Sequence, residues 1–408
     1  MRRVVVTGMG IFSSIGKTPQ EITTSLCEGK SGIVYSEEYA KYGFRSLVQA
    51  LVKGFDPKTI ERKHRRHLGV GRILLLGCAA MKEAVADGRL TEELMSSPMT
   101  GVIVGTGGPS TQDQVEASIK TMERGAGRIG ALKVVPTMSS GFAAALSTFF
   151  AIRGINFSIT SACATSAHAL GEAWWMIRTG RQNIIFAGGA EDCHWTKVQG
   201  FDGMRALSCA SNNTPGVASR AYDRDRDGFV AAEGAGIVVL EELEHAKARG
   251  AHIHAEVLGY GATSDGHSMT APSGEGAVRC MQQALATTEG RKIDYINPHG
   301  TSTPIGDGPE IEAIKEVFGE DIPPIASTKS LTGHSLGAAG VQEAIYTILM
   351  MNAGFICASA HIDNLDPAFA GVPIVRKRID GAEINLAMSN SFGFGGTNAC
   401  LVLARFVP

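Results

Sequence analysis

One cysteine stands where a strand is expected to give way to a helix. Residues 155–178 read INFSITSACATSAHALGEAWWMIR, with alternating apolar residues up to Ile159 and an alanine-rich run after Cys163. The alternation predicts a strand and the following run predicts a helix, with Cys163 at the turn between them. A thiol at a helix start lies at the positive end of the helix dipole, which lowers its pKa and favours a nucleophilic thiolate. The alternative is a structural cysteine, because free cysteines are among the most buried residues.

Two histidines lie in glycine-, serine- and threonine-rich loops in the second half of the chain. His299 follows a short expected strand at 295–297 in NPHGTSTPIGD, and His334 follows another at 325–328 in KSLTGHSLGAAG. Two neutral imidazoles that donate N–H bonds to one oxygen stabilise a developing enolate. Metal ligation is the competing interpretation, but no carboxylate or further cysteine stands at ligand spacing beside either histidine.

Charged and aromatic residues accompany the histidine loops. Lys329 precedes His334 by five residues and adds positive charge, with an exposed loop lysine as the alternative. Glu310 and Glu343 are expected to open the next helices, where either balances Lys329, orients a histidine or simply favours the helix dipole. Phe394 lies in FGFGG. The glycines on either side leave its backbone N–H available to an oxyanion hole and its ring free to swing over the nucleophile.

The composition is that of a well-packed scaffold for such a site. Of the 408 residues, 44% are hydrophobic and 19% charged, which excludes a disordered chain. A net charge of −2 gives no overall field for nucleic acid, so an anionic partner needs a local basic patch. Eight scattered cysteines without a CxxC pair argue against a zinc site and a disulfide framework. No apolar run is long enough for a membrane span and the start lacks a signal peptide, so we expect a cytoplasmic protein.

Strands and helices are expected to alternate throughout the chain. The polar, glycine-rich motifs consistently follow strands, which predicts an α/β protein with a parallel sheet and ligands at the carboxyl ends of its strands. A boundary near residue 250 separates an N-terminal half, 1–250, which carries Cys163, from a C-terminal half, 251–408, which carries the two histidines. The start resembles a dinucleotide fold, but Ser13 replaces the third glycine of that motif, so a plain strand and turn are favoured. The Asp- and Arg-rich segment 220–227 lacks EF-hand ligand spacing and predicts a salt-bridged loop.

The motifs together resemble the elongating β-ketoacyl-[acyl-carrier-protein] synthases of bacterial fatty-acid synthesis. The segments that carry the resemblance are SITSACATSAHALG, NPHGTSTPIGD, STKSLTGHSLGAAGVQEA and NSFGFGGTNA, and it extends from VVVTGMGIFSSIG to the last strand. ACATSAH and YGATSDGHSMTAPSGEGAVRCM favour the type I branch of this family over type II. The resemblance implies a thiolase-like fold, in which two similar βαβαβαββ halves form five layers, α-β-α-β-α. It also implies a homodimer.

The resemblance further implies a decarboxylative condensation. Cys163 takes an acyl group from acyl carrier protein as a thioester. His299 and His334 assist decarboxylation of malonyl-carrier protein, and the resulting carbanion attacks the thioester to give a 3-oxoacyl-carrier protein. Loss of carbon dioxide drives the reaction, so no cofactor is expected. A type II synthase is the near alternative, and a thiolase is disfavoured because His334 stands where thiolases have a second cysteine. A non-catalytic chain-length-factor-like subunit is the alternative of another class, and such subunits lack the nucleophile.

Residue roles follow from the same resemblance. Lys329 is the lysine near the histidines, with Glu310 and Glu343 as its supporting carboxylates. Phe394 is the gating phenylalanine, and its backbone N–H forms the oxyanion hole with that of Cys163. The residues expected to contact the phosphopantetheine arm are Thr301 and Thr303. A structural monovalent cation is expected at Asn297, Glu343, Ser389 and Asn390. Acidic acyl carrier protein is expected to dock on Arg62, Lys63, Arg65, Arg66, Arg124 and Arg128.

Overall fold

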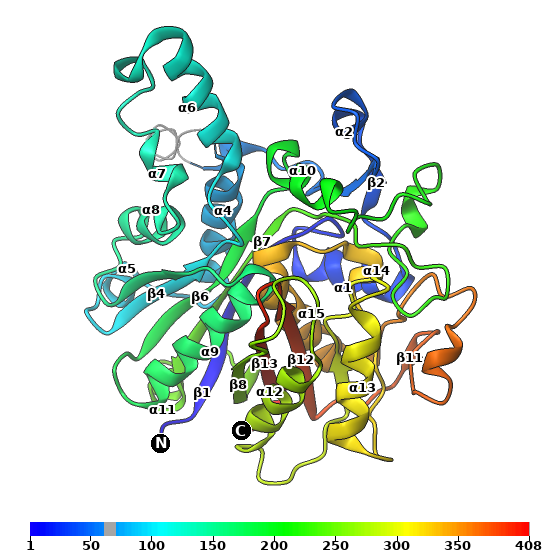
Figure 1. Cartoon of the computed structure of the whole chain (residues 1–408). Coiled ribbons are helices and arrows are strands. Elements are labelled where there is room, and N and C mark those ends of the chain that lie inside the picture. The colour runs from blue at the N-terminus through cyan, green and yellow to red at the C-terminus, as the bar shows by residue number, and fades with distance from the viewer. Residues whose placement is uncertain (61–70, 408) are drawn as a thin grey trace.

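The structure is a computed structural model that describes residues 1–60 and 71–407 (Figure 1). Its described residues form one nine-stranded sheet in the order β5-β4-β6-β7-β1-β8-β13-β12-β9. The strands from the N-terminal half are β1 (Val4–Phe12), β4 (Thr100–Gly105), β5 (Asn156–Ile159), β6 (Ile184–Glu191) and β7 (Gly234–Glu242). Those from the C-terminal half are β8 (Ala255–Ser264), β9 (Tyr295–Asn297), β12 (Leu386–Gly393) and β13 (Thr397–Ala404).

The strand order repeats in mirror image about the β1–β8 pair. Val4–Val6 of β1 pair with residues 255–257 of β8, and this contact joins the two halves of the sheet. Beyond β9, Ile325 forms a one-residue parallel bridge to Ile296, in the place that β5 takes in the N-terminal half. The strand expected at 325–328 is therefore wrong beyond Ile325, because a short helix, α14 (Lys329–Thr332), follows almost at once.

The sheet is mixed, so the expectation of a parallel sheet is only partly right. β4 pairs in parallel with β5 and β6, and β9 pairs in parallel with β12. The last strand of each half returns against its neighbours, which makes β7 antiparallel to β1 and β6, and β13 antiparallel to β8 and β12. β12 and β13 are joined by a turn at residues 394–396, and strands joined by so tight a turn are necessarily antiparallel.

Helices cover both outer faces of the sheet and fill the space between its halves (Figure 1). α4 (Arg72–Asp87) and α8 (Gly141–Phe149) pack on β4, β6 and β7 in one apolar core. α9 (Thr165–Arg178) and α15 (Ala339–Ala353) share the central core with strands of both halves. α12 (Glu275–Leu285) and α13 (Asp307–Phe318) pack on β12 and β13. These cores give the five layers α-β-α-β-α that the resemblance implies.

Strand β1 runs straight through the glycines that resemble a dinucleotide motif. Its residues are buried up to Ile11 and pair with β7 up to Phe12, so the expected strand is confirmed and the expected turn comes after it, at Ser14 and Ile15. A Cβ atom on Gly10 would lie 1.9 Å from the carbonyl oxygen of Ala80 in α4. Glycine is therefore needed here for helix packing and not for binding a phosphate.

The remaining described elements lie outside the nine-stranded sheet. α1 (Pro19–Glu28) begins after Thr18 and ends at Gly29, as its capping residues predict. The segment with α6 (Thr111–Arg124) and α7 (Val134–Thr137) projects from the body (Figure 1). The others are α2 (Glu37–Lys41), α5 (Glu92–Met95), α10 (Trp195–Gly203), α11 (Leu243–Ala248), β2 (Ile33–Tyr35), β3 (Val48–Ala50), β10 (Phe355–Ile356) and β11 (Ile379–Asp380). None of the described helices combines the length and the apolarity that a membrane span needs.

Two smaller expectations are met. All eight cysteines lie in the described part of the chain and carry free thiols. The segment 220–227 is a salt-bridged loop, in which Arg226 contacts Asp366 at 2.7 Å and Asp307 at 3.4 Å. Since Asp307 is buried in the first turn of α13, this loop fixes the start of that helix.

Candidate active site

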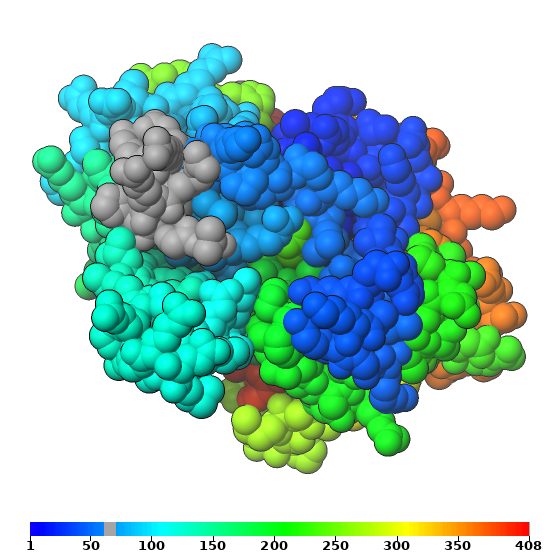
Figure 2. Space-filling model, turned by 90° about the horizontal axis from the view of Figure 1, so that it is seen from above, coloured from blue at the N-terminus to red at the C-terminus, as the bar shows by residue number. Residues whose placement is uncertain are grey.

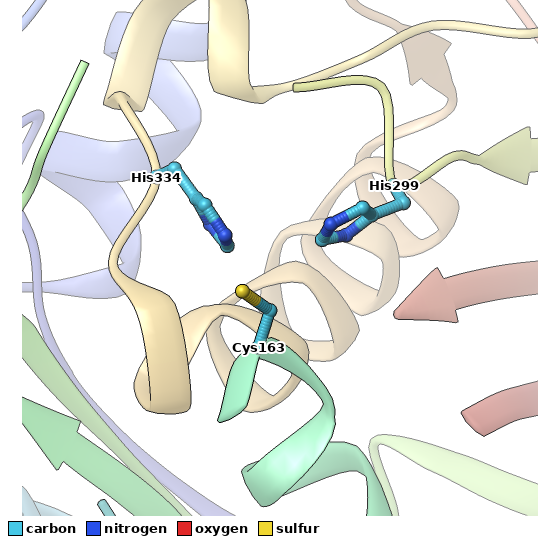
Figure 3. A group of neighbouring side chains, drawn as sticks. All are labelled: Cys163, His299 and His334. Atoms are coloured by element: carbon cyan, nitrogen blue, oxygen red, sulfur yellow. The ribbon is translucent and has the colours of Figure 1, made fainter. Parts of the chain in front are cut away.

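Cys163 lies in a locked turn between strand β5 and helix α9. A 3-10 turn, Ala162–Ala164, carries it, and α9 begins at Thr165. The Thr165 hydroxyl accepts from the backbone N–H of Ser161 and donates to the carbonyl of Ala162, both at 2.8 Å. The expected strand, turn and helix are confirmed, and the turn presents the sulfur to the interior of the molecule (Figure 3).

The two histidines reach Cys163 from the C-terminal half. The sulfur and one ring nitrogen of each of His299 and His334 all lie within 4.8 Å of one another. The ring centroids are 5.2 Å apart and the rings are nearly perpendicular, at 85°. Figure 3 shows both rings and the sulfur pointing into one shared space. The three side chains therefore form one constellation, although more than a hundred residues separate the cysteine from either histidine.

His299 is positioned through its backbone by Glu310. The two carboxylate oxygens of Glu310 accept from the N–H groups of His299 and Gly300, each at 2.7 Å. Asn390 donates to the same carboxylate at 3.3 Å. Glu310 lies in the first turn of α13, which begins at Asp307, so the helix starts earlier than expected. Of the roles expected for this carboxylate, holding a histidine loop is the one that its contacts support.

His334 is held by its backbone against one buried segment, residues 230–232. Its N–H donates to Val230 at 2.8 Å, and its carbonyl accepts from Ala232 at 3.0 Å. Both ring nitrogens of His334, and Nδ1 of His299, are buried without a hydrogen-bond partner among the described residues. Buried polar atoms are normally bonded, so these nitrogens are available to a bound substrate.

Both imidazoles are neutral in this environment. Burial lowers the pKa of His299 and of His334 well below the usual value, and the nearby Lys329 ammonium lowers both further. A neutral imidazole donates one N–H and can also accept a proton. Lys329 also lowers the pKa of Cys163, so the lysine charge favours the deprotonated form of all three groups. A positive environment suits an oxyanion better than a metal cation, which weighs against the metal interpretation.

The thiol itself is not activated in the way the sequence predicts. Burial raises the pKa of Cys163 to about 12, while Lys329 and the backbone N–H groups of Phe394 and Cys163 oppose this rise. The expectation of a lowered pKa is therefore wrong. Cys163 packs against Phe201 and Leu336 in an apolar cluster, and this desolvation outweighs the helix start. The resting group is a thiol, so nucleophilic attack requires a base.

Lys329 forms a buried ion pair with Glu343. Both side chains are 2% exposed. Burial raises the pKa of Glu343 to about 7 against the pull of Lys329, and burial raises that of Glu310 to about 7 against its backbone N–H donors. Glu343 is the fifth residue of α15 and does not open that helix as expected. Glu343 thus balances Lys329, while Glu310 holds the loop of His299.

Phe394 lies in the turn between β12 and β13, directly over Cys163. A Cβ atom on Gly393 would lie 2.9 Å from the Ser161 carbonyl oxygen and 3.2 Å from the Cys163 nitrogen. Only glycine allows this turn to come so close. The backbone N–H groups of Phe394 and Cys163 both lower the pKa of the Cys163 thiol. The ring of Phe394 is partly exposed, with its centroid 6.3 Å from that of Phe201.

A cavity of about 440 Å³ leads from these groups to the surface. Thr301 and Thr303 line it, with their hydroxyl oxygens 3.0 Å apart. Figure 2 shows a hollow in this face, where C-terminal residues are visible between the α6 segment, the segment with α10, and a loop near residue 270. Apolar lining residues that sequence reasoning missed are Phe201, Phe229, Met269, Ile305, Leu336 and Phe392. Met269, Ile305, Leu336 and Phe392 lie within the motif segments quoted above, whereas Phe201 and Phe229 look like core residues in the sequence.

The residues expected around a cation lie together beneath the site. Asn297 donates to the Glu343 carbonyl at 3.5 Å and accepts from Thr328 at 3.4 Å. Ser389 pairs with Asn297 across the β9–β12 ladder. The side-chain oxygens of Ser389 and Asn390 and one oxygen of Glu343 are buried without a partner among the described residues. Such orphaned oxygens fit a hard cation, and the site stays a prediction.

The expected docking residues fall in two regions. Arg62, Lys63, Arg65 and Arg66 lie outside the described residues. Arg124 is the last residue of α6, and Arg128 ends the 3-10 turn Ala126–Arg128 that follows. Both of these arginines are exposed.

Comparisons with known proteins match both halves of the chain. Two family models fit: "Beta-ketoacyl synthase, N-terminal domain" over residues 1–246, and "Beta-ketoacyl synthase, C-terminal domain" over residues 254–363. A "3-oxoacyl-[acyl-carrier-protein] synthase 1" of Haemophilus influenzae is 51% identical over 407 residues, covering 100% of both chains. A "3-oxoacyl-[acyl-carrier-protein] synthase 2" of Vibrio cholerae is 40% identical over 415 residues, covering 99% of both. The higher identity lies with the type I branch.

Solved structures agree with these matches. A β-ketoacyl synthase from Burkholderia phymatum is 36% identical, with a TM-score of 0.94 and 100% of both chains covered. A type II polyketide acyl-carrier protein in complex with its ketosynthase includes a chain that is 29% identical, with a TM-score of 0.87. That alignment covers 99% of the present chain and 100% of the other. The matches thus include the segment of Cys163 and the segments of both histidines.

Proposed function

The chain belongs to the β-ketoacyl synthase family, and we propose that it is an elongating condensing enzyme of type II fatty-acid synthesis. It joins a carrier-bound acyl chain to malonyl-[acyl-carrier-protein], with loss of carbon dioxide, to give a 3-oxoacyl-[acyl-carrier-protein]. The observation that carries this proposal is the meeting of Cys163 with two imidazoles, three of whose ring nitrogens are buried without a hydrogen-bond partner among the described residues. One group forms a thioester and the other two stabilise an oxyanion, which are the two requirements of the reaction.

The first step transfers the acyl group to Cys163. Because the resting group is a thiol, a neutral imidazole accepts its proton as the sulfur attacks the acyl thioester. The thioester oxygen receives hydrogen bonds from the N–H groups of Cys163 and Phe394. Collapse of the tetrahedral intermediate expels the thiolate of the phosphopantetheine arm, which takes the proton from the imidazolium. Thr301 and Thr303 bind that arm along the cavity.

The second step forms the carbon–carbon bond. The malonyl thioester loses its carboxylate as carbon dioxide, and the electron pair moves into the thioester to give an enolate. His299 and His334 donate hydrogen bonds to the enolate oxygen, and the Lys329 charge favours the same anion. The α-carbon then attacks the acyl carbonyl on Cys163. The sulfur leaves as thiolate and takes up a proton from solvent, since burial favours the thiol.

Acyl carrier protein is the partner that this chemistry requires. The curated relative is named for that carrier, and the ketosynthase of the polyketide complex was solved with an acyl-carrier protein. Exposed Arg124 and Arg128 supply positive charge at the end of α6, and charge complementarity accelerates encounter with an acidic carrier. Arg62, Lys63, Arg65 and Arg66 complete the docking patch in this proposal.

A homodimer and a cytoplasmic location belong to the same proposal. β5 is the last strand at one edge of the sheet, and Phe157 of β5 and Trp175 of α9 are 37% and 38% exposed. An edge strand with exposed aromatic residues beside it favours pairing with a second copy. A structural monovalent cation at Asn297, Glu343, Ser389 and Asn390 would neutralise the orphaned oxygens and stabilise the C-terminal half. No redox cofactor is required, because decarboxylation supplies the driving force.

The proposal is tested by mixing the enzyme with hexanoyl-carrier protein and carboxyl-labelled malonyl-carrier protein. We expect release of labelled carbon dioxide together with 3-oxooctanoyl-carrier protein. Release of neither product would contradict catalysis and support the non-catalytic subunit as the alternative. Products extended from long but not medium chains would favour the type II branch instead.

A further inference from the structure

A lysine lies one helical turn from the wall of the Cys163 site. Helix α10 carries Lys197 and Phe201, which are four residues apart and therefore on the same face. Phe201 lines the cavity of Cys163, and one turn of helix, about 5.4 Å, separates it from Lys197. Lys197 is nevertheless buried, with its side chain only 8% exposed. A buried lysine so close to an apolar reaction site requires an explanation.

Lys197 is held in place by two carboxylates at the end of β6. Its ammonium pairs with Glu191, whose side chain is completely buried, and lies 3.5 Å from Asp192. The second oxygen of Glu191 accepts from the backbone N–H of Gly107 at 2.7 Å and of Gly337 at 3.1 Å. The ion pair is thus held by bonds to three separate chain segments, which are helix α10 and the segments of Gly107 and Gly337.

The ion pair adjoins the apolar cluster against which Cys163 packs. Cys163 packs with Phe201 and Leu336 in one apolar cluster. Leu336 precedes Gly337, whose N–H bonds to Glu191. A Cβ atom on Gly107 would lie 2.7 Å from the Glu191 oxygen and 3.6 Å from Leu336 Cβ. The residues beside the sulfur, such as Leu336, are therefore apolar, and the residues directly behind them carry the charges of the ion pair.

A hydrocarbon chain gains nothing from contact with such a wall. Each methylene of an acyl chain favours binding only where it leaves water for an apolar surface. Pushing a chain past the pair means separating two buried charges, which is strongly unfavourable. Lys197 and Glu191 therefore mark the point beyond which further methylenes lose their binding energy.

We propose that the Lys197–Glu191 ion pair ends the acyl-binding site of this enzyme and restricts it to short acyl chains. Lys197 is then the residue that sets chain length, and Glu191 is its positioning residue. This inference rests on the proposed condensing activity, because it concerns the chain held on Cys163.

The experiment measures condensation rates with butyryl-, hexanoyl-, decanoyl- and dodecanoyl-carrier proteins. We expect the natural enzyme to lose about tenfold or more in kcat/KM between hexanoyl and dodecanoyl chains, because the longer chain can be held only by displacing the buried ion pair. Lys197→Met in a Glu191→Gln background removes both charges and leaves an oxygen to accept from Gly107 and Gly337. In this variant the loss should shrink to about threefold or less. Lys247→Met removes an exposed lysine paired with Glu244 and serves as the matched control.

The outcomes separate the two proposals. No condensation with any chain overturns the condensing activity itself. Condensation by the natural enzyme that is equally fast from butyryl to dodecanoyl overturns the ion pair as the end of the site, whether or not the double variant folds. A folded double variant with the same chain-length profile as the natural enzyme overturns it as well. Thermal melting of both variants identifies the folded samples.

Discussion

Two buried lysine–glutamate pairs act on Cys163, one from each half of the chain. Lys329 and Glu343 come from the C-terminal half, and Lys197 and Glu191 from the N-terminal half. Both pairs are buried. Their effects on the sulfur are opposite in sign, because Lys329 lowers the pKa of Cys163 while Glu191 raises it. The same pairing of residue types therefore serves different ends.

The neighbours of each pair explain the difference. Lys329 acts on groups that exchange protons or bond a substrate: it lowers the pKa of both catalytic histidines and pulls against the raised pKa of Glu310. Glu191 instead bonds two backbone N–H groups from separate loops. Lys329 lies near groups that are free to bond a substrate, so its charge can take part in the reaction. The hydrogen bonds of Glu191 are made within the protein, so its charge helps to fix the shape of the site.

The largest expected effect comes from removing an imidazole beside Lys329. His299→Ala and His334→Ala each remove a donor to the enolate oxygen, and we expect carbon dioxide release to fall about 10² to 10³-fold. Labelled malonyl-carrier protein measures this release, and His252→Ala, at an exposed histidine, is the control. A loss smaller than tenfold in both variants would place the enolate elsewhere.

Substituting Lys329 and Lys197 one at a time tests whether the two ion pairs have different roles. Lys329→Met and Lys197→Met each leave a buried glutamate without its partner, and we expect each to lower the free energy of unfolding by about 3 to 5 kcal/mol. Only Lys329→Met should also slow carbon dioxide release from hexanoyl- and malonyl-carrier protein. Denaturant unfolding and steady-state rates measure the two effects. Equal slowing by both substitutions would refute the division of roles.

Glu310, which lies near Lys329, is expected to make the stability of the protein depend on pH. Glu310 has a folded-state pKa of about 7 against an ordinary value of 4.5, so the folded protein binds the proton more tightly than the unfolded chain. Its stabilisation is complete below the ordinary value and is lost as the pH rises towards 7. The total loss is about 3 kcal/mol. We expect Glu310→Gln to flatten this decline in urea unfolding between those pH values.

Glu312 provides the control for that measurement. It lies in the same helix, and its side chain is 69% exposed beside Lys315. Glu312→Gln should leave the pH profile as it is in the natural enzyme. An unchanged profile for Glu310→Gln would mean that another group carries the dependence.

The smallest expected effect concerns charges that are not buried. Arg124→Glu together with Arg128→Glu reverses exposed charge at the end of α6. We expect KM for acyl-carrier protein to rise up to about tenfold at low ionic strength, with kcat unchanged, because surface charges mainly steer encounter. The difference should diminish as salt is added. A change in kcat with KM unchanged would show that these residues act on the chemistry instead.

Local sequence predicted the elements that carry the site. The alternation before Cys163 and the alanine-rich run after it predicted the strand, turn and helix at Cys163, and the loop of His299 follows a strand as expected. The β12–β13 turn at Phe394 could also be recognised, because glycines flank the ring. These features depend on neighbouring residues, which a sequence displays.

The environment of those residues could not be predicted in this way. A helix start suggests a reactive thiolate, but the apolar cluster around Cys163 comes from segments far away in sequence and raises its pKa instead. Lys197 in the segment WTKVQGF looks like an exposed helix residue, because its partner Glu191 ends a strand and shows no charge pattern with it. Burial and partners across the fold decide the state of an ionisable group, and neither is local.

The most direct test of the central claim is mass spectrometry of the enzyme after mixing with hexanoyl-carrier protein alone. We predict one hexanoyl adduct per chain, located on the peptide of Cys163, absent from Cys163→Ser and discharged when malonyl-carrier protein is added. An adduct on another cysteine, or no adduct in a folded enzyme, would contradict the account.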